Sequence, residues 1–181
     1  GIHGMSGVWG AIATGIFAVP SVGGVAGLME KSTIKNCVVT GTKVSGAKTG
    51  IGGFVGYLKK PEASLIENCT LEGASSVSGS QNVGGYVGWF DAGTLKNCVV
   101  QGNSTITGTG DGVGGLIGRA VSRNGSDDII ESCEVRGGTV ITGTYSLGGL
   151  VGYAYPDADG NLYILNCGVK ETTIHGLSCD S

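Results

Sequence analysis

The chain has 181 residues, of which 37 are glycine and 3 are proline, and its formal net charge is −3. The glycines follow no Gly-x-y period, which excludes a collagen helix, and 40% hydrophobic residues with so little charge exclude a fully disordered chain. Charged residues make up 14% and form no basic stripe, so nucleic acid is not expected as a partner.

The first 29 residues contain no charged side chain, and a hydrophobic run within them ends at Pro20. Residues 1–21 differ from everything that follows, and two interpretations stay open. The segment is either a cap on the domain behind it or a hydrophobic helix of marginal membrane-spanning length. Contact with a membrane is expected only through residues 1–29.

The stretch GIHGMSGVWGAIATGIFA resembles a late membrane helix of the ammonium transporter family. The resemblance covers residues 1–27 and implies that His3 matches one of two histidines that line the ammonia pore. The other membrane helices and the second histidine are absent from the sequence, so this chain alone is not expected to conduct ammonia. Either the following residues are an extracellular insertion or fusion on a transporter, or a transporter fragment now serves as a hydrophobic cap.

From residue 22 onward, three short motifs recur in a fixed order. The first motif is a double glycine followed by a third glycine, at residues 22–27, 51–56, 83–88, 113–118 and 147–152. The second is a cysteine unit, which contains Cys37, Cys69, Cys98, Cys133 and Cys167. The third is a Val/Ile-x-Gly unit at residues 44–46, 77–79, 106–108, 141–143 and 174–176. The double glycines start 29, 32, 30 and 34 residues apart, which is typical of a solenoid repeat.

Each copy holds three β-like runs separated by Gly, Ser or Asn, and strong helix formers are sparse. We therefore predict an all-β fold, a single parallel β-solenoid over residues 22–181. It would have about five three-strand coils of about 30 residues stacked at roughly 4.8 Å. The general handedness of parallel crossovers favours a right-handed β-helix. The double glycine is expected to supply an unusual backbone angle and little bulk at a repeated corner.

The cysteines are expected to form a buried, unbridged column. They lack the close pairing or histidine neighbours of metal and redox sites, and thiols stacked at strand spacing point in parallel rather than toward each other. The spacing of apolar residues around each cysteine predicts a bend just before it, near Asn36, Asn68, Asn97 and Asn166. Asn tolerates the left-handed conformation, and its amide can pair with the next Asn in the column.

Two outer columns follow from the repeat. Tyr57, Trp89 and Tyr153 each follow the third glycine and share a column with Leu28 and Arg119. Such aromatics either cover a corner or contact carbohydrate or protein. The charges at positions 35, 67, 96 and 131 alternate in sign, which favours a role in setting the register of the strands.

Two polar insertions fall in neighbouring copies, at residues 122–128 and 157–161. Asp157 and Asp159 are weak candidates for a calcium loop, but the bidentate Glu of such a loop is missing, so a turn is preferred. Insertions on one face of a solenoid often bind partners, and these two could form one acidic patch for a contact or a cation.

The motifs GGFVGY, GGYVGW and GGLVGY, followed by a cysteine strand, resemble the GLUG-type repeat over residues 22–176. This resemblance implies a scaffold found in bacterial and archaeal surface proteins, including adhesin-like proteins and the N-terminal regions of IgA-cleaving metallopeptidases. It implies no activity, and the zinc signature H-E-x-x-H of those peptidases is absent.

We therefore expect a non-enzymatic extracellular or cell-surface module without a cofactor, which acts as a spacer, an adhesin-like element or an assembly subunit. Its expected partner is a surface glycan, a protein, or a second copy joined end to end, because an open solenoid end exposes strand edges. The alternatives are an extracellular domain attached to an ammonium transporter and a polysaccharide-active β-helix enzyme.

Overall fold

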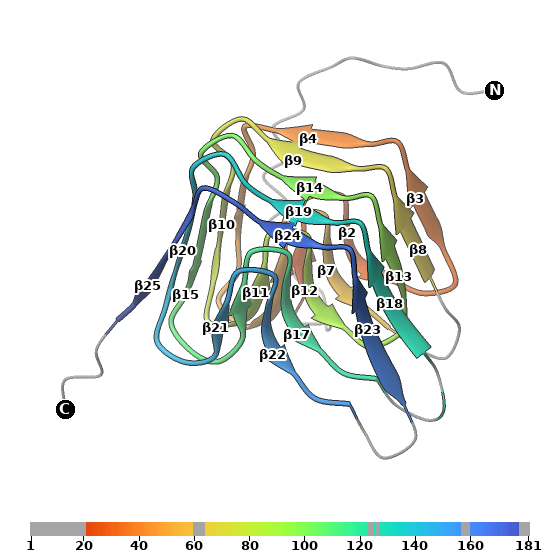
Figure 1. Ribbon diagram of the computed structural model, residues 1–181. Coiled ribbons are helices and arrows are strands. Elements are labelled where there is room, and N and C mark those ends of the chain that lie inside the picture. Colours follow the sequence, from red (N-terminus) through yellow and green to blue (C-terminus); the bar gives the residue numbers. More distant parts are fainter. Residues whose placement is uncertain (1–20, 60–63, 123–124, 126, 157–159, 178–181) are drawn as a thin grey trace.

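The chain forms a parallel β-solenoid of five coils. The computed structural model describes residues 21–59, 64–122, 125, 127–156 and 160–177. These residues form 25 short strands in five parallel sheets, and each coil contributes one strand to every sheet (Figure 1). The expected N-terminal cap or helix covers residues 1–21, and all of it except Ser21 lies outside the described residues, as does His3. Within the described residues, no helix has the length and apolar character needed to cross a membrane.

The double-glycine motif supplies the first two strands of every coil. The first strands are β1 (Val22–Gly23), β6 (Thr49–Gly52), β11 (Gln81–Gly84), β16 (Val113–Gly114) and β21 (Leu147–Gly148). The second strands are β2 (Ala26–Met29), β7 (Val55–Leu58), β12 (Val87–Phe90), β17 (Ile117–Ala120) and β22 (Val151–Ala154).

The cysteine motif and the Val/Ile-x-Gly motif supply the other three strands. The third strands are β3 (Thr33–Lys35), β8 (Ser64–Glu67), β13 (Gly93–Lys96), β18 (Asp127–Glu131) and β23 (Asn161–Leu165). The fourth strands are β4 (Val38–Thr40), β9 (Thr70–Glu72), β14 (Val99–Val100), β19 (Glu134–Val135) and β24 (Gly168–Val169). The fifth strands are β5 (Lys43–Ser45), β10 (Ser76–Gly79), β15 (Thr105–Gly108), β20 (Thr139–Gly143) and β25 (Thr172–Gly176).

The prediction of three strands per coil is wrong, because two of the three motifs are bent in the middle. In the cysteine motif the bend falls on the predicted residues: Asn36, Asn68, Asn97 and Asn166 have φ between 51° and 56°. In the fourth copy Ser132 takes the same conformation, with φ of 54°. The expected amide column is also present, since Asn97 Nδ2 donates to Asn68 Oδ1 at 3.0 Å and Asn68 Nδ2 donates to Asn36 Oδ1 at 3.3 Å.

At the double glycine the chain turns back on itself, as β21 and β22 show in Figure 1. The first two glycines of the motif do not have positive φ, so the expected unusual angle is wrong. Their small size is what the corner needs. A Cβ on Gly84 would lie 2.1 Å from the Val87 carbonyl oxygen, and one on Gly88 would lie 2.3 Å from the Ile51 nitrogen. The two arms of the corner therefore pack backbone against backbone.

The core consists of columns of like residues from successive coils. Ile66, Leu95 and Ile130 pair in register on β8, β13 and β18, and none of them is exposed. Each such side chain contributes roughly 1.5–3 kcal/mol by leaving water. The rings of Phe54 and Tyr86 stack inside the solenoid with their centroids 4.5 Å apart.

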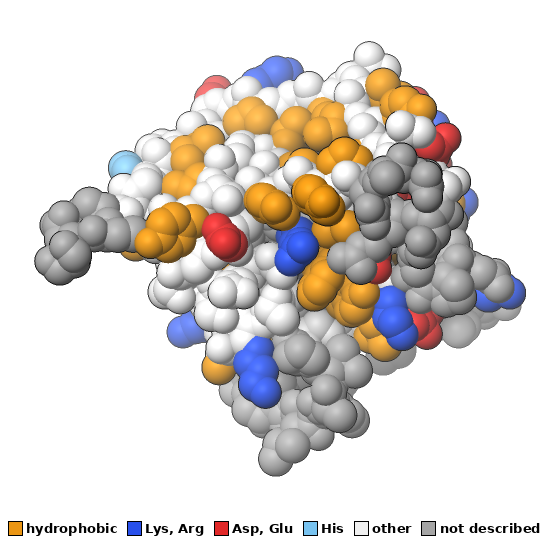
Figure 2. All heavy atoms as spheres, turned by 90° about the horizontal axis from the view of Figure 1, so that it is seen from below, with side chains coloured by type: hydrophobic (Ala, Val, Ile, Leu, Met, Phe, Trp, Pro, Cys, Tyr) orange, Lys and Arg blue, Asp and Glu red, His pale blue; other side chains and the backbone are white. Residues whose placement is uncertain are grey.

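One end of the stack is open. Inward-facing side chains of the fifth coil are exposed, namely Ile164 (43%), Val169 (43%) and Ile174 (45%). Their equivalents one coil earlier are fully buried, namely Ile130, Val135 and Ile141. In the first coil the equivalent residues are less exposed, since Val44 is 5% exposed and Ile34 and Val39 are half-buried. Figure 2 shows hydrophobic side chains along one rim of the molecule, where this open end lies.

Candidate functional site

An outward column of side chains crosses the sheet formed by the second strands. The strand register places Leu28, Tyr57, Trp89, Arg119 and Tyr153 on neighbouring strands, one above the other. We call these five residues the aromatic column. The sequence predicted its members and their order correctly, because each follows the third glycine of its motif. In Figure 2 hydrophobic side chains gather on this face beside a basic one.

The side chains of the aromatic column stack on one another. The rings of Tyr57 and Trp89 lie 5.0 Å apart at an angle of 30°. The guanidinium carbon of Arg119 lies 5.0 Å from the centre of the Trp89 ring and 5.4 Å from that of Tyr153. Each cation–π contact is worth about 0.5–1 kcal/mol at an exposed site. The ring faces of Trp89 are therefore occupied from both sides, which the sequence did not reveal.

Tyr153 keeps one ring face away from the other members of the aromatic column. Arg119 covers one side of the ring, and no coil among the described residues follows on the other side. Tyr153 is 39% exposed, whereas Tyr57, Trp89 and Arg119 are half-buried. The side chains of the column thus cover one another along most of its length, and Tyr153 offers an aromatic surface at the C-terminal end.

Some polar atoms of the aromatic column have hydrogen-bond partners and others have none. The Tyr57 hydroxyl donates to Asp91 Oδ2 at 3.1 Å, and Asp91 is only 6% exposed. Trp89 Nε1 and Arg119 Nε are buried and have no acceptor among the described residues. The described residues also contain no carboxylate in an ion pair with Arg119.

Other charged side chains pair across neighbouring strands. Lys35 Nζ lies 2.9 Å from Glu67 Oε2, and Lys96 Nζ lies 3.0 Å from Glu131 Oε2. These ion pairs confirm the alternating column, and Glu131 raises the pKa of Lys96.

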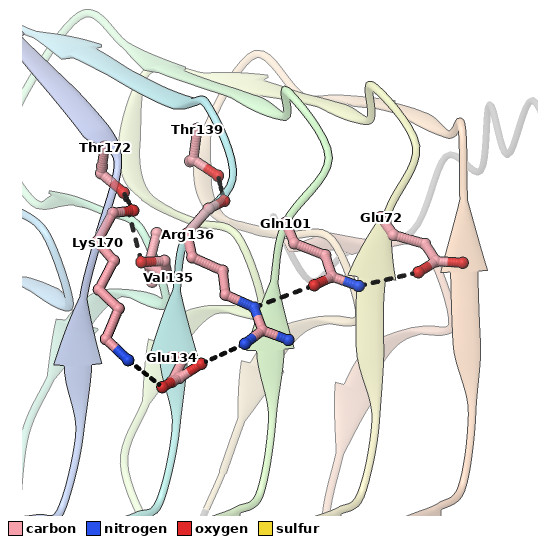
Figure 3. A network of polar contacts seen from close by, with 8 residues as sticks. All are labelled: Glu72, Gln101, Glu134, Val135, Arg136, Thr139, Lys170 and Thr172. Atoms are coloured by element: carbon pink, nitrogen blue, oxygen red, sulfur yellow. Dashed lines mark hydrogen bonds and ion pairs between the residues drawn. The ribbon is translucent and has the colours of Figure 1, made fainter.

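A second polar network, shown in Figure 3, joins Glu72, Gln101, Arg136, Glu134 and Lys170 across four coils. Lys170 and then Arg136 lower the pKa of Glu134. These charges are engaged with each other, which is the arrangement that sets the register of stacked strands.

The five described cysteines form the expected column and are all free thiols. Each thiol donates to the carbonyl oxygen two residues earlier at 3.1–3.3 Å. Burial raises the pKa of the Cys37 and Cys167 thiols. Hydrogen bonds with the thiols of Cys133 and Cys69, together with burial, raise the pKa of Cys98. Hydrogen bonds to Cys98 lower the pKa of the Cys69 and Cys133 thiols. The three central cysteines are fully buried, which favours a packing role over reactivity.

The expected acidic patch lies partly outside the described residues, and one of its carboxylates is buried. Asp128 is fully buried and accepts hydrogen bonds from the Gly93 amide at 2.8 Å and from Ser122 Oγ at 2.6 Å. Asp127 Oδ1 accepts from Asn161 Nδ2 at 3.0 Å. The carboxylate of Asp128 therefore ties the insertion to the core, which a polar stretch of sequence does not reveal.

The calcium-loop candidates Asp157 and Asp159 lie outside the described residues. Within the part of the chain that the structure describes, no cluster of three or more His, Cys, Asp or Glu side chains could hold a metal.

No family model matches the chain, and no curated protein does. Among solved structures, the chain is similar to the crystal structure of a putative immunoglobulin A1 protease from Bacteroides ovatus. The TM-score is 0.58 and the identity 22%, over 88% of this chain and 55% of that one. This likeness supports the β-solenoid fold. The chain spans about half the length of the protein it resembles.

Proposed function

We propose that the chain is a non-enzymatic repeat module of an extracellular or cell-surface protein, and that it binds a glycan or protein partner at the C-terminal end of the aromatic column. The observation that carries this proposal is the exposed side chain of Tyr153, which stacks on Arg119 across a parallel sheet. Sugar rings and apolar side chains both pack on such a face. The fixed sheet lowers the entropy lost on binding.

Two further observations support a non-enzymatic role in a surface protein. The repeats resemble GLUG-type surface proteins, and the description of the similar Bacteroides ovatus protein names an antibody as its substrate. The charges on the outer faces are engaged in interstrand networks, which suits a scaffold better than a polysaccharide-cleaving site. We therefore propose together that the chain has no catalytic activity, that it lies outside the cell or on its surface, and that it is a rigid support with a binding surface.

A glycan array probed with the purified chain tests the binding proposal. We expect selective binding that falls about tenfold in Tyr153→Ala, equivalent to roughly 1.4 kcal/mol, and persists in Tyr153→Phe. The matched control is Tyr163→Ala, since Tyr163 is similarly exposed, at 42%, but lies on β23 in another sheet. Equal loss in both alanine variants would contradict a specific role for Tyr153, and no binding to any glycan would refute the carbohydrate part.

The open end defined by Ile164, Val169 and Ile174 favours a second role, assembly with another copy. These inward-facing side chains are apolar, and the strand edges β21–β25 have a neighbouring strand on one side only among the described residues. The equivalent residues of the first coil are less exposed, because Val44 is buried and Ile34 and Val39 are half-buried. We therefore propose that two copies join through the same end, which gives a closed pair rather than a filament.

Light scattering after size-exclusion chromatography tests this assembly. We expect a dimer for the wild-type chain and a monomer for Ile174→Lys, because the added charge would be buried in the joint. The control is Val38→Lys, whose side chain is 61% exposed on the first coil. A monomeric wild type at high concentration would rule the pair out.

A further inference from the structure

Arg119 is a charged residue with aromatic neighbours and no acidic partner among the described residues. Arg136 shows the usual arrangement in this fold, because its Nη1 lies 2.8 Å from Glu134 Oε2 and its Nε donates to Gln101. Arg119 instead lies between Trp89 and Tyr153, and its Nε is buried without an acceptor. The guanidinium group of Arg136 is thus paired with a carboxylate, whereas that of Arg119 is not.

The stacking fixes the plane of the Arg119 guanidinium. Contact with a ring on each side restrains its rotation, so its terminal amino groups form a preorganised fork. With Nε buried, these amino groups are the donors left to a ligand. A planar fork of this kind matches the two oxygens of a carboxylate, and charge-assisted pairs are about twice as strong as neutral hydrogen bonds.

Two acidic residues close to the aromatic column in sequence make hydrogen bonds to other groups. Asp91, two residues after Trp89, is almost fully buried and accepts the Tyr57 hydroxyl proton. Asp111, which precedes β16, accepts a hydrogen bond from Ser146 Oγ at 3.2 Å. Neither carboxylate pairs with Arg119, so its positive charge is available to an incoming anion.

We propose that the aromatic column binds an acidic glycan, with a sugar carboxylate on the Arg119 fork and a neighbouring sugar ring on Tyr153. This inference rests on the proposed glycan-binding function and narrows it to carboxylate-bearing sugars. Uronic acids and sialic acids share this chemistry. The guanidinium carbon lies 5.4 Å from the centre of the Tyr153 ring, on the face opposite the exposed one, so a glycan would reach both groups across the edge of the ring.

Isothermal titration calorimetry with paired probes tests the inference. The uronate pair is an oligogalacturonate and its methyl ester, and the sialate pair is sialyllactose and lactose. We expect at least one acidic probe to bind at least tenfold more tightly than its neutral counterpart. Arg119→Gln should abolish this difference, and Arg119→Lys should weaken it, because lysine keeps the charge but loses the fork.

The matched control is Arg136→Gln, which removes the same charge from a different sheet and should leave the affinity unchanged. Circular dichroism and the urea midpoint establish that each variant is folded. Equal affinity for acidic and neutral probes, or equal loss in Arg119→Gln and Arg136→Gln, would overturn the inference and leave the glycan-binding function standing. Failure of all four probes to bind would overturn the inference, and a blank glycan array would remove the function as well.

Discussion

The tight corner at the double glycine makes Gly84 the most sensitive small residue to test. In Gly84→Ala the new Cβ would lie 2.1 Å from the Val87 carbonyl oxygen, 2.6 Å from the Gly118 nitrogen and 2.9 Å from the Leu116 oxygen. All three atoms belong to the backbone. The corner can yield only if these strands separate by about 1 Å, the difference from an ordinary carbon–oxygen contact.

Such a separation disrupts the hydrogen bonds of the corner. Gly53 N donates to Gly84 O, and Gly85 N donates to Gly114 O, each at 3.3 Å. Each lost bond costs about 1 kcal/mol, and overpacking adds about 1–3 kcal/mol. We therefore expect Gly84→Ala to lower the free energy of unfolding by about 3–5 kcal/mol.

The matched control is Gly168→Ala on β24. There the nearest atom to a new Cβ is Glu134 Cγ at 3.9 Å, which is an ordinary contact, and Gly168 has no positive φ. Alanine at such a site leaves stability unchanged or raises it by about 0.4–1 kcal/mol, because the unfolded chain loses freedom. Urea unfolding followed by far-ultraviolet circular dichroism measures both variants. A change within about 0.5 kcal/mol for Gly84→Ala, or equal losses in both, would refute the backbone-contact argument.

Three further outcomes follow from the buried and charged columns. Burial raises the pKa of Tyr86, so the unfolded chain loses the phenol proton at a lower pH than the folded chain does. The free energy of unfolding should therefore fall as the pH rises above about 10, by up to about 1.4 kcal/mol per pH unit. Urea unfolding at several alkaline pH values measures this slope, and an unchanged slope in Tyr86→Phe would contradict it. Cys98, fully buried with a raised pKa, should react with a thiol reagent such as DTNB only after denaturation; equal rates in native and denatured protein would show that the column is open. Lys96→Glu aligns three glutamates, at positions 67, 96 and 131, and should cost about 1 kcal/mol by urea unfolding. Adding Glu131→Lys should restore about half of that loss, because the new glutamate at position 96 then faces the new lysine at position 131 but still faces Glu67, and no recovery would argue against the charge column.

The sequence by itself determined the stack and its columns. Neighbouring coils differ by a translation of one strand spacing, so a period in the sequence becomes a period in space. This is why the cysteine column, the left-handed Asn bends and the order of the aromatic column could be read from residue spacing alone. The three motifs were also correct, although two of them contain a bend and so give two strands each.

The tertiary structure decided what the repeat pattern leaves unspecified. Side-chain rotation, rather than spacing, makes the rings and the guanidinium of the aromatic column stack on one another and leaves Tyr153 more exposed than Tyr57 and Trp89. Departures from the repeat, such as the insertion that buries Asp128, depend on contacts with particular atoms of neighbouring coils. The exposure of apolar side chains at the C-terminal end likewise depends on the tertiary structure. A repeated motif has the same letters in every coil, but its side chains are buried only where another layer of chain covers them.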